Sequence, residues 1–130
     1  MSDHTHRSHA EEVRERWGHT DSYRQAAIRT KSYSESDWAE IKAELESIES
    51  DFAVAFEQGI APDADTARAL AERARLHIDG RYYACSHEMH ATLADMYTAD
   101  ERFRAHYDDR VEGLAEYVAA AIRANAAAND

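Results

Sequence analysis

Residues 34–57 constrain the fold more than any other part of the sequence. Apolar side chains recur there at steps of three and four residues, at Trp38, Ile41, Leu45, Ile48, Phe52 and Phe56. This spacing predicts one long amphipathic helix whose apolar stripe packs into a core. Ser34 with Asp37, or Ser36 alone, provides a cap at its start, and a loop containing Pro62 follows its end.

Further helices are expected on both sides of this one. The same periodicity and capping signals place them at 11–17, from 20 or 21, at 64–79, from 86, from 98 and at 111–125. Asp63 or Asp65 is the expected cap of the 64–79 helix and Gly80 its end, while Thr98 and Glu101 fit a capping box. With only four glycines and one proline and no strand-like alternation, the sequence predicts an all-α fold.

The length of 130 residues fits one domain. We expect a disordered polar tail at 1–10, a helical domain at 11–125 and a disordered end at 126–130. The helices expected within the N-terminal third are short and thinly apolar, and such helices are marginal in water. This third is therefore expected to be mobile until something packs on it.

The charge balance excludes several partners. There are 26 acidic residues against 15 basic ones, for a net charge of −11, and the lysines are Lys31 and Lys42 alone. Direct binding to nucleic acid or to an anionic membrane is not expected. A single cysteine, Cys85, excludes an intramolecular disulfide and indicates a reducing, cytoplasmic setting. The N-terminus lacks the features of a signal peptide, and no apolar run reaches membrane-spanning length.

The segment 82–90 concentrates the side chains that could carry chemistry. It holds Tyr82, Tyr83, Cys85, His87 and His90 within nine residues. If the serine after Cys85 caps the next helix, the unpaired backbone N–H groups of that helix favour the thiolate, and protonated histidines add to the effect. The tyrosines lie in a connector where no periodicity requires them, so they are candidates for the wall of a groove.

Other interpretations of these residues stay open. A lone cysteine is more often a small buried apolar residue than a reactive group. The pattern Cys-x-His-x-x-His lacks a fourth ligand and a standard zinc spacing, so no metal is expected. A nucleophile–base pair of Cys85 and His90 lacks a third orienting residue, so no enzyme is expected. His77 lies on an apolar face, which is typical of an interior histidine with satisfied partners.

The run Cys-Ser-His-Glu-Met-His at 85–90, followed by Leu93-Ala94-Asp95-Met96-Tyr97, resembles the drug-recognition domain of the TipAS family. The landmarks Arg16-Trp17-Gly18, Thr30-Lys31-Ser32-Tyr33 and Gly113-Leu114-Ala115-Glu116-Tyr117 extend the resemblance over residues 11–125. His87 and Ala84 stand where prolines are common in the family.

This resemblance implies a compact globin-like helical domain without haem or another cofactor, whose cleft captures macrocyclic thiopeptide antibiotics such as thiostrepton. It also implies that Cys85 adds to a dehydroalanine of the drug, and that N-terminal helices order on the ligand. Family members often carry a MerR-type DNA-binding domain and a coiled coil, and this sequence has neither. A monomer that sequesters drug and gives resistance is therefore expected. The alternative is a ligand-sensing domain that signals to a separate partner and binds other bulky aromatic antibiotics non-covalently. The residues expected to contact ligand are Trp17, Trp38, His77, Tyr82, Tyr83, Met89, His90, Leu93 and Tyr97.

Overall fold

The computed structural model describes residues 21–129. Its six helices are α2 (Asp21–Lys31), α3 (Glu35–Glu57), α4 (Asp65–Arg81), α5 (His87–Ala99), α6 (Glu101–Asp108) and α7 (Leu114–Ala128). The described part of the chain contains no strand, so the expected all-α fold is confirmed. The expected tail at 1–10, the helix at 11–17 and the candidate Trp17 lie outside the described residues.

The long helix α3 starts as the sequence predicts. Ser34 Oγ accepts a hydrogen bond from the Asp37 backbone N–H, and the Asp37 carboxylate accepts one from the Ser34 N–H, which completes a capping box. Its stripe is buried less evenly than predicted. Ile41, Ile48 and Phe52 are buried, and the other three stripe residues are half-buried or exposed.

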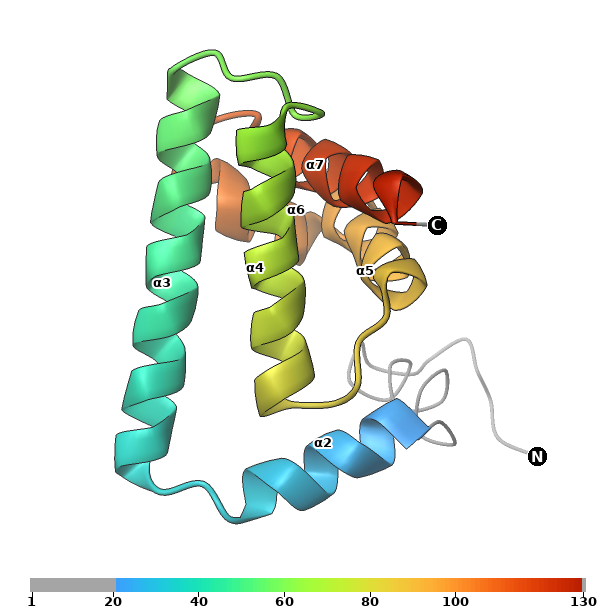
Figure 1. The fold of residues 1–130 in the computed structure, drawn as a ribbon. Coiled ribbons are helices and arrows are strands. Elements are labelled where there is room, and N and C mark those ends of the chain that lie inside the picture. The colour runs from blue at the N-terminus through green and yellow to red at the C-terminus, as the bar shows by residue number, and fades with distance from the viewer. Residues whose placement is uncertain (1–20, 130) are drawn as a thin grey trace, which may run out of the picture.

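Trp38 and Leu45 are 41% and 38% exposed, so the prediction that the whole stripe packs into the core is wrong for them. Helix α3 packs mainly against α4 and α7, and so part of its long stripe stays at the surface. The two helices α3 and α4 lie side by side, and α7 extends from the upper part of α4 away from α3 (Figure 1).

Gly80 does not end the fourth helix, as the sequence suggested, because α4 continues to Arg81. The backbone of Gly80 is not in the left-handed region, whereas Gly59 and Gly113 are. The N–H groups of Tyr82 and Tyr83 both donate hydrogen bonds to the carbonyl of Ile78, and these bonds close the helix just after Arg81. At the other end Ala64 occupies the N-cap position without a side-chain bond, in place of the predicted aspartate cap.

The later helix starts follow the sequence in part. Ser86 caps α5 by accepting from the Met89 N–H at 3.0 Å, as predicted. The start of α6 is capped by Asp100, which accepts from Arg102 N–H, and not by Thr98. Helix α7 starts after Gly113 and runs to Ala128, so it begins and ends about one turn later than the predicted 111–125.

Gly113 is required by geometry at the start of α7. Its φ of 92° lies in the left-handed region, and an added Cβ would meet the Phe56 ring at 3.2 Å. This close approach lets α7 enter the centre of the molecule, where it packs against α3, α4, α5 and α6. Most of its buried side chains are small or branched and apolar, and the full set is Leu114, Ala115, Tyr117, Val118, Ala119, Ala121, Ile122 and Asn125.

Helix α2 crosses the lower end of α4 (Figure 1), and polar contacts attach it there. None of its residues is buried. Gln25 accepts a hydrogen bond from the Ala84 N–H at 3.0 Å, and Arg29 donates to the Asp79 carbonyl at 2.6 Å. Just after the helix, the Tyr33 hydroxyl donates to the Arg81 carbonyl. Helix α2 is thus attached to the segment that leads to Cys85.

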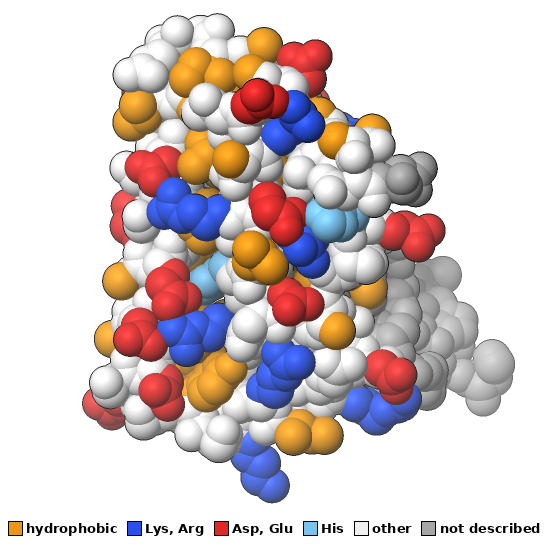
Figure 2. Space-filling model, viewed as in Figure 1, with side chains coloured by type: hydrophobic (Ala, Val, Ile, Leu, Met, Phe, Trp, Pro, Cys, Tyr) orange, Lys and Arg blue, Asp and Glu red, His pale blue; other side chains and the backbone are white. Residues whose placement is uncertain are grey.

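Acidic and basic side chains lie beside one another over the face shown in Figure 2, with hydrophobic side chains between them. Several of the pairs join helices, such as Arg81 with Glu40 and Glu44, and Arg73 with Asp51. Within residues 21–129, none of the helices combines the length and the apolar character needed to cross a bilayer.

Candidate functional site

A cavity of about 500 Å³ opens between α3 and the later helices. Its walls are mostly apolar or aromatic, which is typical of a small-molecule site. The lining side chains are Leu45, Glu49, Phe52, Ala74, His77, Ile78, Tyr82, His90, Tyr97, Arg102, Phe103, His106, Tyr107, Val118 and Ile122.

Four of the residues expected to contact ligand lie in this lining: His77, Tyr82, His90 and Tyr97. Trp38 lies next to it, because its ring packs on the Tyr82 ring at a centroid distance of 6.3 Å. Three others, Tyr83, Met89 and Leu93, are not among the lining residues. Met89 instead borders a shallow depression at the start of α5, with Ser86, Glu88 and Thr92.

Aromatic rings form a row along one side of the cavity. Tyr33 meets Trp38 edge to face at 5.4 Å, Trp38 meets Tyr82, and Tyr82 meets the His77 ring at 6.4 Å. Such pairs are typically worth about 0.5–1.5 kcal/mol beyond the area that they bury. The row therefore links the start of α3 to the wall that α4 provides.

A second aromatic group also lines the cavity, and of its members the sequence analysis predicted Tyr97 but missed Phe103 and Tyr107. Tyr97 contacts Phe103 at 5.8 Å and Tyr107 at 5.5 Å. Burial raises the pKa of both tyrosines well above the ordinary range. The available signal was the presence of two aromatics in α6, a helix too short to need them for a core stripe.

Polar side chains break the apolar lining at a few places. Glu49 is buried, and its carboxylate accepts a hydrogen bond from His106 Nε2 at 2.8 Å. Arg110 lies 3.5 Å from the same carboxylate. Burial lowers the pKa of His90 to about 4, so its ring is neutral near pH 7.

Cys85 matches the small buried residue that a lone cysteine more often is, and not the activated thiol that its position before a helix suggested. Its side chain is 1% exposed, and it is not among the residues that line the cavity. Burial raises the pKa of the thiol to about 11, although the nearby Arg75 acts in the opposite direction. The position before the α5 N-terminus is as expected, but desolvation outweighs the favourable charges there. The neutral His90 adds no positive charge, and His87 is hydrogen-bonded to Glu72.

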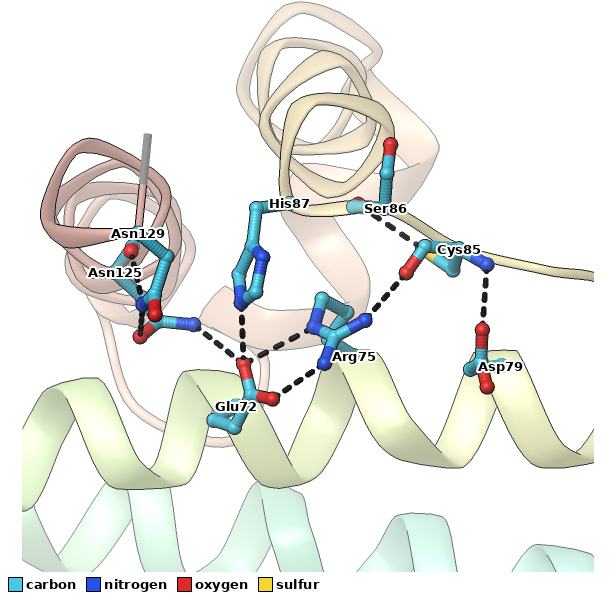
Figure 3. A network of polar contacts seen from close by, with 8 residues as sticks. All are labelled: Glu72, Arg75, Asp79, Cys85, Ser86, His87, Asn125 and Asn129. Carbon is cyan, nitrogen blue, oxygen red and sulfur yellow. Dashed lines mark hydrogen bonds and ion pairs between the residues drawn. The ribbon is translucent and has the colours of Figure 1, made fainter.

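A polar network holds the Cys85 segment in place (Figure 3). Glu72 on α4 accepts hydrogen bonds from Arg75, from His87 Nε2 at 2.8 Å and from Asn125 at 3.0 Å. These bonds, led by the one from Arg75, lower the pKa of Glu72 to about 2. The network therefore joins α4 to the start of α5 and to the last turn of α7.

Two bonds from α4 then fix the backbone of Cys85 itself. Arg75 donates to the Cys85 carbonyl at 2.7 Å, and the Asp79 carboxylate accepts from the Cys85 N–H at 2.9 Å. The thiol donates a weak hydrogen bond to the Ser86 carbonyl, at 3.7 Å. Within residues 21–129, no group of three or more His, Cys, Asp or Glu side chains is arranged to hold a metal ion.

Comparison with known proteins matches this chain to one family over almost its whole length. Residues 9–125 match the TipAS antibiotic-recognition domain. The chain is 43% identical over 116 residues to the HTH-type transcriptional activator TipA of Streptomyces coelicolor, and 33% identical over 115 residues to the HTH-type transcriptional activator mta of Bacillus subtilis. These matches cover 89% and 88% of this chain but only 46% and 44% of the two relatives.

Two solved structures are similar as well. One is TipAS of Streptomyces lividans in complex with nosiheptide, from a thiopeptide multidrug resistance system, at a TM-score of 0.84 and 42% identity over 92% of this chain and 84% of the other. The second is the antibiotic-binding domain of a TipA-class multidrug resistance regulator, at a TM-score of 0.64 and 36% identity over 68% and 95% of the two chains. The chain belongs to the TipAS antibiotic-recognition domain family.

Proposed function

We propose that this chain binds thiopeptide antibiotics in the cavity between α3 and α5–α7 and sequesters them, which gives drug resistance. One observation carries the proposal. The aromatic cavity of about 500 Å³ lies in a chain that is 42% identical, at a TM-score of 0.84, to a protein solved with nosiheptide. The two aromatic walls supply stacking area for a bulky planar ligand.

Calorimetric titration with nosiheptide tests this function. A ligand held at about 100 times its Kd stabilises the fold by about 2.7 kcal/mol. For a domain of this size that corresponds to a rise in Tm of roughly 8 °C. No heat of binding and no rise in Tm with nosiheptide or thiostrepton would contradict the proposal.

A matched pair of variants locates the site. Leu45 and Leu76 are both exposed leucines, at 38% and 52%, but only Leu45 lines the cavity. Leu45→Ala is expected to weaken nosiheptide binding about tenfold through lost apolar contact. Leu76→Ala is expected to leave the affinity unchanged. Equal effects of the two substitutions would place the ligand elsewhere.

Covalent capture through Cys85 is a further part of the proposal. The thiolate sulfur adds to the β-carbon of a dehydroalanine, and the α-carbon then takes up a proton, so the product mass is the sum of protein and drug. Because the thiol is buried and protonated near pH 7, capture requires the 82–86 connector to open and is slow. Intact-protein mass spectrometry after incubation with nosiheptide checks this, with Cys85→Ala as control. Persistent binding without an adduct at pH 9 would exclude the covalent step.

A second candidate function is drug sensing for a separate partner, with non-covalent binding of other bulky aromatic antibiotics. It is favoured by the relatives, which are transcriptional activators whose length exceeds twice the part that this chain matches. A pull-down with and without nosiheptide tests it. A partner whose binding changes with the drug would support sensing, and an unchanged set of partners would leave sequestration as the function.

A further inference from the structure

Two buried side-chain polar atoms of the described residues have no hydrogen-bond partner: His77 Nε2 and the Tyr117 hydroxyl. Buried polar groups in folded proteins are almost always paired, so each exception calls for an explanation. The two differ in position. His77 lines the cavity, whereas Tyr117 lies in the core against Phe56 and does not. Only the histidine therefore carries its unpaired atom on a side chain that lines the proposed binding site.

The other nitrogen of His77 holds the ring in place. Nδ1 lies 3.0 Å from Glu44 Oε1, across 33 residues of sequence. Hydrogen bonds from Arg81 to both Glu44 oxygens lower the pKa of that carboxyl and keep it ionised. A carboxylate only accepts, so the shared hydrogen lies on Nδ1. In the neutral ring Nε2 then carries a lone pair, which is a hydrogen-bond acceptor.

The surroundings of His77 make this acceptor selective. The side chain is 6% exposed, and its neighbours on the cavity wall are apolar or aromatic, including Ile78 and Tyr82. A hydrogen bond formed where water is excluded discriminates strongly, because a ligand without the donor leaves the acceptor unpaired. The Arg81–Glu44 pair fixes the ring from the side away from the cavity, in the way that outer partners orient metal-binding or catalytic histidines.

We propose that His77 is the polar specificity residue of this cavity, and that its Nε2 accepts a hydrogen bond from an amide N–H of a macrocyclic peptide. This inference rests on the proposed function, because it needs a peptide ligand in the cavity. It assigns to His77 a role different from the satisfied interior histidine that its apolar helix face suggested.

The test compares three forms of the full chain by calorimetric titration with nosiheptide. His77→Phe keeps the ring volume and removes both nitrogens, and it is expected to weaken binding about tenfold. His77→Gln retains an acceptor near the position of Nε2 and is expected to bind within about threefold of the unsubstituted chain. Glu44 keeps its bonds to Arg81 in both variants, so the Tm without ligand is expected to change by only a few degrees.

A second measurement reports on the atom itself. In long-range ¹H–¹⁵N spectra, the Nε2 resonance of His77 is expected to shift on saturation with nosiheptide, since the lone pair becomes hydrogen-bonded, while Nδ1 stays bonded to Glu44. A purely structural role for His77 would not produce this selective shift.

The outcomes separate the two proposals. If the unsubstituted chain binds nosiheptide and His77→Phe binds equally well, or if Nε2 does not respond to the ligand, the role of His77 is overturned and the proposed function stands. If His77→Phe fails to fold, the Gln variant and the Nε2 resonance decide. If the unsubstituted chain does not bind nosiheptide at all, the proposed function fails and this inference fails with it.

Discussion

Glu72 is the centre of the polar network beside the Cys85 segment. Its carboxylate accepts hydrogen bonds from Arg75, His87 and Asn125, and so joins α4 to α5 and α7 (Figure 3). Glu72→Gln keeps the shape of the side chain and removes its charge. We expect this substitution to lower the free energy of unfolding near neutral pH and to loosen the start of α5.

The pKa of Glu72 gives the magnitude. A fall from the ordinary value of 4.5 to about 2 corresponds to about 3 kcal/mol of stability if all of it is counted. The side chain is 33% exposed, and solvent screening reduces the contribution to about 1–2 kcal/mol. Because folding lowers this pKa, the stabilisation is complete above about pH 4.5 and is lost as the pH falls towards 2.

Urea denaturation at pH 7 and at pH 3 measures the effect. At pH 7 Glu72→Gln is expected to cost about 1–2 kcal/mol, and at pH 3 the difference from the unsubstituted chain is expected to shrink. Glu57 is exposed at the end of α3, so Glu57→Gln serves as control and is expected to stay within about 0.5 kcal/mol. A cost that is the same at both pH values, or no larger than that of the control, would refute the assigned role of the charge.

Three further predictions concern the thiol, a helix cap and the core. Alkylation of Cys85 by iodoacetamide is expected to rise about tenfold per pH unit between pH 7 and 10, because burial raises the thiol pKa to about 11; a mass-spectrometric rate that levels off below pH 9 would contradict this. Ser86→Ala removes the bond from the Met89 N–H and is expected to cost about 1 kcal/mol by calorimetry, whereas Ser86→Asp keeps a cap and is expected to cost less; equal losses would contradict the cap. Phe52→Ala, at a position that is 1% exposed, is expected to cost about 3–5 kcal/mol in urea denaturation, against less than 1 kcal/mol for the exposed Val54→Ala; similar costs would contradict the assigned core.

The sequence predicted those features that depend on neighbours along the chain. The capping box of Ser34 and Asp37 and the cap of Ser86 were both predicted, because a cap joins residues three positions apart. The all-helical class followed from apolar side chains at steps of three and four, which is a local periodicity as well. The family followed from short motifs around Cys85, and the comparisons confirm it.

Contacts between distant residues decided the rest. The sequence alone did not show that Trp38 and Leu45 would be exposed, because burial depends on which helices pack over each part of α3. It left a buried cysteine and an activated thiol at Cys85 both open, since the charge of a helix N-terminus is visible in a cap signal and desolvation by packing is not. Tertiary structure likewise brings Glu44 to His77 from 33 residues away, and leaves Nε2 of that histidine without a partner. Local spacing determined the helices and the family, and only packing determined the cavity and the chemical state of the residues around it.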